Sequence, residues 1–308
     1  MKVGVIGAGT VGNASLLSMV LRRSAREVVI VNRNRKKAKA VATDMQYGTA
    51  MFPAVAIQDG DYSDLAGAHL VMIAAGINEK TGGATDRSDP KGRLKLLDAN
   101  VSVYKDILPQ LKKAAANAVV LVLTDPPDPL ADFVREFGFE RVLSSGTFLD
   151  SLRFRFHLGR HLQVDPAYVE AQVVGEHGTS EVLLWSSARV AGVPVLARRD
   201  AEQLMQSIER EVRYANITII EGNQASQYGI GMAAARIAEM VLRDERAVIP
   251  IGSYNAKYGV TLSLPSILGS QGVLEILDPA MSEEEKEALE RSAQTLRHAF
   301  GRIKDQAA

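Results

Sequence analysis

A histidine between glycines is the first feature of this 308-residue chain that could do chemistry. His177 follows an apolar run expected to form a strand, and Gly175 and Gly178 keep bulky side chains away from it. An imidazole can give and take a proton near neutral pH. Asp150 and Arg153 stand three residues apart in a segment with a helical pattern, so they share one face of that helix. If the fold brings Asp150 to His177, its carboxylate would orient the imidazole and favour the protonated form.

A glycine-rich turn near the start of the chain has the spacing of a dinucleotide-binding loop. The pattern G-x-G-x-x-G follows an expected strand and opens an expected helix. Such glycines permit a tight turn and let the backbone approach a pyrophosphate, which the helix N-terminus attracts. The residues expected to contact the cofactor in this turn are Gly7, Ala8, Gly9, Thr10, Val11 and Gly12.

The end of the second expected strand bears on which dinucleotide is bound. NAD-binding folds usually place Asp or Glu there to bind the ribose hydroxyls, whereas this chain has Asn32, followed by Arg33 and Arg35. A carboxylate would repel a 2′-phosphate, but an amide does not, and an arginine can bind it through two hydrogen bonds. We therefore expect NAD or NADP as the cofactor, with NADP favoured. The alternative is that the basic run 33–37 is only the solvated start of a helix.

Composition restricts the class of protein. The chain has 36 Lys plus Arg and 36 Asp plus Glu, so it lacks the basic field that nucleic-acid binding needs. It has no cysteine, which excludes disulfides and Cys-ligated metals. No apolar run reaches the roughly 18 to 20 residues of a membrane span, and a strand-like run begins at once, without a signal peptide. We expect a cytoplasmic, metal-free protein that contacts neither nucleic acid nor membrane.

Strands and helices alternate in the first half of the chain. The expected strands are 2–6, 27–31, 55–58, 69–75 and 118–123, and the expected helices are 10–21, 34–47 and 93–116. This alternation predicts right-handed βαβ units and a doubly wound parallel sheet of the Rossmann type, an α/β fold.

The second half has a mixed pattern. We expect a strand at 168–174, helices at 200–220 and 231–243, an antiparallel pair at 248–252 and 260–264, and a closing helix that Ser282 caps. We place the domain boundary near residue 146. Residues 1–146 would form the dinucleotide-binding domain and residues 147–308 a mixed α+β catalytic domain.

Several motifs together resemble the lactate/malate dehydrogenase family over almost the whole chain. They are residues 7–12, Gly60-Asp61-Tyr62, Ala75-Gly76, Arg93 with Asn100, residues 124–128, residues 146–154 and residues 175–178. The resemblance implies an NAD(P)-dependent L-2-hydroxyacid dehydrogenase that interconverts a lactate-like hydroxy acid and its 2-oxo acid by hydride transfer. It also implies a homodimer or a homotetramer, although the chain lacks the N-terminal arm of some tetramers.

The resemblance assigns a role to each candidate residue. His177 would be the acid and base, and Asp150 would hold its imidazole in place. Arg153 would bind the substrate carboxylate, and Arg93 would polarise the carbonyl and help exclude water. Ser226 would supply a hydroxyl near the substrate. The further residues expected near the cofactor are Ala75, Gly76 and Asn100.

Asp125 departs from the family pattern. It stands where the family has an asparagine that donates a hydrogen bond to the substrate carbonyl. A carboxylate cannot donate unless it is protonated, and its charge opposes an anionic substrate. Three explanations stay open: the carboxyl is protonated, the substrate differs, or the activity is weak.

The loop between Gly76 and Arg93 is longer than in typical lactate dehydrogenases. Arg87 stands six residues before Arg93, where malate enzymes carry an arginine for a second carboxylate. This position favours malate, whereas the length of the loop resembles that of 2-hydroxyisocaproate dehydrogenases, which take larger apolar side chains. An alternative of another class is a weakly catalytic, dinucleotide-binding redox sensor, which only Asp125 supports.

Overall fold

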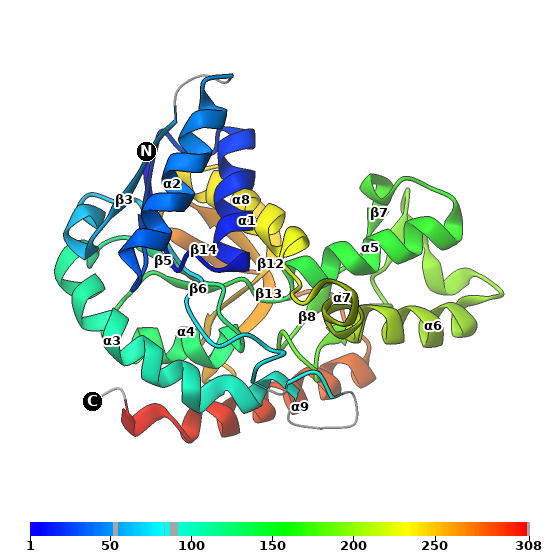
Figure 1. Ribbon diagram of the computed structural model, residues 1–308. Coiled ribbons are helices and arrows are strands. Elements are labelled where there is room, and N and C mark those ends of the chain that lie inside the picture. Colours follow the sequence, from blue (N-terminus) through cyan, green and yellow to red (C-terminus); the bar gives the residue numbers. More distant parts are fainter. Residues whose placement is uncertain (52–54, 83, 87–91, 307–308) are drawn as a thin grey trace.

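A mixed sheet runs through the middle of the molecule (Figure 1). The computed structural model describes residues 1–51, 55–82, 84–86 and 92–306. The strands from the first half of the chain pair in parallel. They are β1 (Lys2–Ile6), β2 (Glu27–Val31), β3 (Ala56–Gly60), β4 (Leu70–Ile73), β5 (Val119–Val122) and β6 (Val142–Ser144). Their order, β3-β2-β1-β4-β5-β6, is that of a doubly wound Rossmann sheet, which confirms the predicted fold class.

Helices cover both faces of this sheet. One face packs against α1 (Thr10–Arg22), α2 (Arg35–Thr49) and α8 (Tyr228–Leu242). The other face packs against α3 (Leu97–Ala115), α4 (Pro127–Glu136) and α9 (Glu283–Gly301). All four residues of β4 are buried, so its sequence is a continuous apolar run without alternation. None of the helices in the described residues is long and apolar enough to cross a membrane.

The second half of the chain extends the same sheet with antiparallel strands. They are β12 (Ala247–Asn255), β13 (Val260–Gly269) and β14 (Gly272–Ile276). β12 lies beside β6, where Gly252 pairs with Ser144. The predicted antiparallel pair is confirmed, and both of its strands are longer than the apolar pattern indicated. The pattern did not predict β6, β14 or α4.

The rest of the second half surrounds a separate apolar core, on the right in Figure 1. Its helices are α5 (Phe148–Leu162) and α6 (Ala201–Arg213), and α7 (Ala215–Asn223) follows α6 directly. Its short strands are β7 (Val169–Glu170), β8 (Val173–Val174), β9 (Val182–Leu183), β10 (Arg189–Val190) and β11 (Val193–Pro194). The short 3₁₀ helices of the chain are η1 (Tyr62–Leu65), η2 (Gly92–Leu96), η3 (Pro166–Tyr168), η4 (Val195–Ala197) and η5 (Lys304–Gln306).

Two predicted elements of the second half are wrong. The strand predicted at 168–174 is interrupted, because β7 pairs with β10 whereas β8 pairs with β9 in another sheet. The helix predicted at 200–220 is two helices, α6 and α7, which meet at Tyr214. Buried positions recur every four residues through this break, from Leu204 to Ile220, so the apolar pattern cannot reveal it.

Two other predicted helices have distinct N-terminal structures: one begins with a 3₁₀ turn, and the other begins with a side-chain cap. The helix predicted at 93–116 begins with the 3₁₀ turn η2 before α3 starts at Leu97. The closing helix α9 is capped as predicted. The Ser282 hydroxyl accepts a hydrogen bond from the Glu285 N–H at 3.3 Å, and the Glu285 carboxylate accepts one from the Ser282 N–H at 2.8 Å. This reciprocal pair is a capping box.

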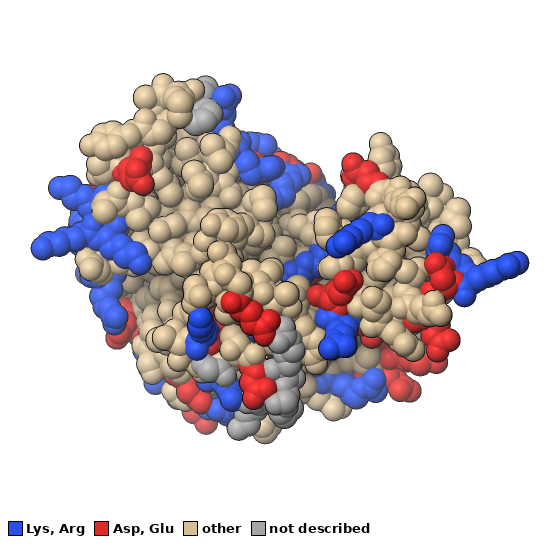
Figure 2. Space-filling model, turned by 45° about the vertical axis from the view of Figure 1, so that its right-hand side comes forward, with Lys and Arg blue, Asp and Glu red and all other residues tan. Residues whose placement is uncertain are grey.

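Charged side chains of both signs appear on the face shown in Figure 2, with a group of basic ones at its left edge. This distribution agrees with the balance of 36 basic and 36 acidic residues in the chain.

Helix α8 crosses α1 so closely that one position must lack a side chain. A Cβ at Gly231 would lie 2.7 Å from the backbone carbon of Ala14 in α1. Backbone atoms in a packed interior cannot move aside unless the helix itself shifts. Gly231 therefore allows α8, from the second half of the chain, to pack closely against α1.

Replacing Gly231 by alanine is expected to lower the free energy of unfolding by about 1–3 kcal/mol, because the added methyl overpacks this crossing. The measurement is urea unfolding at a fixed chain concentration. Gly301→Ala, at the end of α9, is the matched control, since nothing lies within 4 Å of its Cβ position. Equal midpoints for the two variants would contradict the packing argument.

Candidate active site

Two adjoining clefts open at the carboxyl ends of the parallel strands. The larger, of about 1250 Å³, is lined by the glycine-rich turn, the end of β2 and part of α3. The smaller, of about 310 Å³, is lined by the start of α1, the segment after β4 and residues around His177. Gly9, Lys37 and Gly76 belong to the walls of both. Ligands of doubly wound folds bind in the crevice at this end of the strands.

The glycine-rich turn has the shape and the free donors that a pyrophosphate needs. Gly7 has a φ of +110°, and its N–H donates to the Val31 carbonyl at 2.8 Å. A Cβ at Gly12 would lie 1.9 Å from the Gly7 carbonyl oxygen, so only glycine fits there. Gly9 is the N-cap of α1, and no side chain caps its first N–H groups. These groups and the positive end of the helix dipole suit a dinucleotide phosphate.

Asn32 joins the end of β2 to this turn. Its Oδ1 accepts a hydrogen bond from the Ala8 N–H at 3.0 Å, and its Nδ2 donates to the Asn34 carbonyl at 3.0 Å. Asn32 also lines the larger cleft. A neutral amide that is already hydrogen-bonded therefore occupies the place where NAD-binding folds usually have a carboxylate.

The two arginines after Asn32 differ in their surroundings. Arg35 forms an ion pair with Asp59 at 2.9 Å and another with Asp61. Arg33 is exposed and lines the same cleft. It forms no hydrogen bond or ion pair with another residue in the part of the chain that the structure describes. Arg33 therefore brings positive charge to this end of the cleft, and no carboxylate among the described residues pairs with it.

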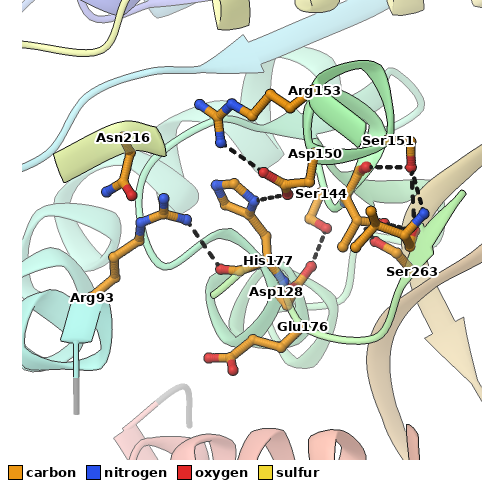
Figure 3. Close-up of polar contacts among 12 residues, drawn as sticks. Arg93, Asp128, Ser144, Asp150, Ser151, Arg153, Glu176, His177, Asn216 and Ser263 are labelled. Carbon is orange, nitrogen blue, oxygen red and sulfur yellow. Dashed lines mark hydrogen bonds and ion pairs between the residues drawn. The ribbon is translucent and has the colours of Figure 1, made fainter. Parts of the chain in front are cut away.

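His177, Asp150 and Arg153 meet at the wall of the smaller cleft (Figure 3). Asp150 and Arg153 lie one turn apart on α5, and His177 lies shortly after β8. The Nδ1–H of His177 donates to Asp150 Oδ2, and Arg153 Nη1 donates to Asp150 Oδ1 at 2.7 Å. The Asp150 side chain is 1% exposed. One buried carboxylate thus holds both the imidazole and the guanidinium.

The charges around this carboxylate shift two pKa values in opposite directions. Burial alone would raise the pKa of Asp150, but the charge and the hydrogen bond of His177 and the charge of Arg153 lower it far below its usual range. Burial and the charge of Arg93 lower the pKa of His177, whereas Asp150 and Asp125 raise it, and the net effect is a raised pKa. Asp150 is therefore ionised near neutral pH, and the protonated form of His177 is favoured.

Arg93 points into the same cleft from η2 (Figure 3). Its Nε donates to Glu79 Oε1 at 3.1 Å, and its Nη1 lies 3.4 Å from the His177 carbonyl oxygen. Asn216 of α7 donates to the same Glu79 oxygen at 3.0 Å. Sequence reasoning did not identify Glu79 or Asn216, because neither belongs to a recognisable motif.

Asp125 faces the other ring nitrogen of His177. Its Oδ1 lies 3.9 Å from His177 Nε2. Asn100 fixes the backbone here, since its Nδ2 donates to the Asp125 carbonyl at 2.5 Å and its Oδ1 accepts from the Ile77 N–H at 2.7 Å. A cis peptide bond joins Asp125 to Pro126. The imidazole therefore lies between two carboxylates, and Asn100 is occupied with holding the loop.

Asp128 is a further carboxylate that sequence reasoning did not assign. It is fully buried on α4, and its two oxygens accept hydrogen bonds from the His177 N–H at 2.8 Å and from the Ser144 hydroxyl at 2.5 Å. Burial raises the pKa of Asp128 to about 7, although these hydrogen bonds lower it. The signal was present in the run 124–128, whose last residue is this aspartate. Asp128 fixes the backbone of His177 while Asp150 fixes its ring.

The remaining predicted residues mostly line the clefts. Thr10, Val11 and Ser226 line the smaller cleft, Ala75 lines the larger, and Gly76 lines both. A Cβ at Gly76 would lie 2.3 Å from the Thr124 side chain. Arg87 lies outside the described residues. Within the described ranges, no group of three or more His, Asp or Glu side chains could hold a metal ion.

Known proteins resemble this chain over nearly its full length. It is 42% identical over 304 residues to an L-lactate dehydrogenase of Deinococcus radiodurans, covering 96% of this chain and 97% of that protein. It is 43% identical over 312 residues to an L-lactate dehydrogenase of Thermus aquaticus, covering 97% and 98%. Among solved structures, a lactate dehydrogenase from a Medee basin deep-sea metagenome superposes with a TM-score of 0.89 at 32% identity, covering 97% and 98%.

The family descriptions match both halves of the chain. Residues 1–141 match the NAD-binding domain of lactate/malate dehydrogenase, and residues 147–307 match its α/β C-terminal domain. These two matches together span most of the sequence. The chain therefore belongs to the lactate/malate dehydrogenase family, and it is an NAD-dependent oxidoreductase of the CH–OH group.

Proposed function

We propose that the protein interconverts a small L-2-hydroxy acid, lactate or a close relative, and its 2-oxo acid. The observation that carries this proposal is the convergence of His177, Arg93 and Arg153 on one cleft that adjoins the glycine-rich turn. A proton donor and two guanidinium groups are what the reduction of a 2-oxo acid needs beside a hydride source. The relatives named L-lactate dehydrogenase support lactate as the substrate.

Each residue has one task in this reaction. In reduction, His177 gives the proton on Nε2 to the carbonyl oxygen, and in oxidation it takes that proton back from the hydroxyl. Asp150 holds Nδ1 and stabilises the imidazolium. Arg93 stabilises the charge that develops on the carbonyl oxygen. The nicotinamide supplies or accepts the hydride when it is bound.

Arg153 binds the substrate carboxylate without leaving Asp150. Only Nη1 of its guanidinium is hydrogen-bonded to Asp150. A guanidinium has five N–H donors in a planar fork, so donors remain for a two-pronged contact with a carboxylate. Ser226, in the same wall, adds a hydroxyl on the substrate side.

Asp125 acts on His177 Nε2, the nitrogen that exchanges the proton. Its negative charge 3.9 Å away favours a protonated imidazole, as the charge of Asp150 does from the other side. An ionised Asp125 cannot donate to the substrate carbonyl, so Arg93 and His177 supply the donors for that oxygen.

We propose that the protein uses NADP as well as NAD, and that the charges of the larger cleft favour NADP. Asn32 brings no negative charge to the ribose, and Arg33 brings an uncompensated positive charge to the same wall. Arg35 is neutralised by Asp59 and Asp61, so Arg33 is the residue that would bind a 2′-phosphate. The glycine-rich turn would hold the pyrophosphate.

Three features of the whole protein belong to the same proposal. Residues 1–146 would bind the dinucleotide and residues 147–308 would complete the substrate site.

A homodimer or homotetramer is supported by apolar side chains that are exposed on α1 and α8, namely Leu17, Leu21, Tyr228 and Met232. We also propose a cytoplasmic location, because other enzymes have to recycle the nicotinamide cofactor.

A panel of 2-oxo acids tests the activity. Pyruvate, oxaloacetate and 4-methyl-2-oxopentanoate are offered with NADH and with NADPH, and oxidation of the nicotinamide is followed by absorbance. We expect turnover of pyruvate, a loss of about 10²-fold or more in kcat for His177→Asn, and a raised KM for Arg153→Ala. Asp44→Asn, on the exposed side of α2, is the control. NADH binding without turnover of any 2-oxo acid would favour the redox sensor instead.

The pH profile tests the role of Asp150. Reduction needs protonated His177, so the rate is lost as the pH rises through the pKa of His177. Asp150→Asn removes a charge that raises this pKa, and the alkaline loss of kcat/KM is expected to move to lower pH. The same variant is expected to lose about 10²-fold or more in kcat. An unmoved alkaline limb would contradict the role of Asp150.

Arg33→Ala tests the cofactor proposal. The variant is expected to raise the KM for NADPH about tenfold and to leave the KM for NADH nearly unchanged, because only NADPH carries the 2′-phosphate. Lys36→Ala is the matched control, since Lys36 is an exposed cation near the start of α2 that does not line the described cleft. Equal effects of Arg33→Ala on the two cofactors would refute the assignment.

A further inference from the structure

A glutamate from the loop after β4 lies in the wall of the substrate cleft. The Glu79 side chain is 12% exposed, and the residue lines the same cleft as His177, Arg93 and Arg153. Its Oε1 accepts hydrogen bonds from Arg93 Nε at 3.1 Å and from Asn216 Nδ2 at 3.0 Å. Both partners thus hold one oxygen of the carboxylate in a fixed position.

The second oxygen of Glu79 has no such partner. No other residue that the structure describes is hydrogen-bonded to Oε2. Burial and the charge of Asp125 raise the pKa of Glu79, while the charge of Arg93 and the hydrogen bond of Asn216 lower it. A carboxylate this deeply placed, with one oxygen anchored, is a rigid hydrogen-bond acceptor.

Three of the cationic residues that line the cleft, Arg93, Arg153 and His177, are paired with carboxylates, and Lys37 is the fourth cation in its wall. Asp150 binds His177 and Arg153, and Glu79 binds Arg93. The site therefore has little surplus positive charge beyond what a single substrate carboxylate requires. A second carboxylate on the substrate would enter a cleft that contains Glu79 and Asp125, both of which repel it.

The substrate side chain would face the part of the cleft wall that the other substrate contacts do not use. In the proposed function, the carboxylate goes to Arg153 and the carbonyl oxygen to His177 and Arg93. The rest of the wall includes the loop after β4 and the turn between α7 and α8. Its lining residues are Ile77, Asn78, Glu79, Ala225 and Ser226.

We propose that Glu79 is a specificity-determining residue, which selects 2-oxo acids whose side chain donates a hydrogen bond and rejects those whose side chain is a second carboxylate. The proposal rests on the proposed function and adds the substrate class to it. A hydroxyl next to the carbonyl would donate to the Glu79 carboxylate. This assignment differs from the expectation at Arg87, which favoured a dicarboxylate.

A simpler role for Glu79 is to hold Arg93 in place. The two roles have different effects on the ratios of kcat/KM between 2-oxo acids. A residue that only positions Arg93 changes kcat/KM by the same factor for every 2-oxo acid, because Arg93 acts on the carbonyl that all of them share. A residue that contacts the side chain changes the ratios between substrates.

Three 2-oxo acids of similar size test the proposal: 3-hydroxy-2-oxopropanoate, 2-oxobutanoate and oxaloacetate, whose side chains end in a hydroxyl, a methyl and a carboxylate. In the unaltered protein, kcat/KM is expected to be at least about tenfold higher for the hydroxyl compound than for the methyl compound. For oxaloacetate it is expected to be at least about tenfold lower than for the methyl compound. Glu79→Leu, which removes the hydrogen-bond acceptor, is expected to abolish the preference for the hydroxyl compound over the methyl compound. Glu79→Gln, which removes only the charge, is expected to raise the kcat/KM for oxaloacetate, relative to that for the methyl compound, at least about tenfold.

The controls separate this proposal from the proposed function. Glu202→Gln, at an exposed glutamate in the first turn of α6, is expected to leave both ratios unchanged. Turnover with the same ratios in the unaltered protein and in both Glu79 variants would overturn the inference and leave the proposed function intact. Absence of turnover with all three compounds would overturn both.

Discussion

The buried carboxylate of Asp150 is the group on which the rest of the site depends. Burying an ionised carboxylate is unfavourable unless cations and hydrogen bonds compensate it. Here His177 and Arg153 both bind it, and the side chain is 1% exposed. The same compensation fixes both groups that the proposed reaction uses, because the imidazole turns Nε2 toward the cleft and the guanidinium stays at its wall. Helix α5 can present both Asp150 and Arg153 because residues three apart share one face.

The position of that carboxylate follows from the junction where both halves of the sheet meet. Gly146, after β6, has a φ of +51°, and a Cβ there would lie 2.1 Å from the Ser263 hydroxyl of β13. The Thr147 N–H donates to the same hydroxyl at 2.9 Å, and the Thr147 hydroxyl donates to the Val173 carbonyl of β8. The start of α5 and the strand before His177 are thus tied to one point. Asp150 and His177 meet because each lies a few residues beyond it.

Local patterns in the sequence were enough to predict residues that the structure brings together at the cleft, and not the more distant residues that support them. His177 between glycines, and Asp150 with Arg153 on one helix face, are signals within a few residues. The contact of Asp128 with the His177 backbone joins residues 49 apart, and the contact of Glu79 with Asn216 joins residues 137 apart. Such contacts depend on tertiary packing, which no apolar period encodes. The break between α6 and α7 escaped prediction for a related reason, since the buried spacing of four continues through it.

The pairing of charges in the cleft explains why a departure such as Asp125 can be tolerated. A lone carboxylate beside an anionic substrate would oppose binding, but Asp125 lies 3.9 Å from His177 Nε2 and raises the pKa of that imidazole. In the proposed reaction, the proton on His177 therefore compensates the charge of Asp125 until the reduction consumes that proton. Once that proton has moved to the product, a neutral imidazole faces an anion, and release of an anionic product is favoured. In the proposed reduction, the charge of Asp125 is thus compensated while the substrate binds and assists the departure of the product.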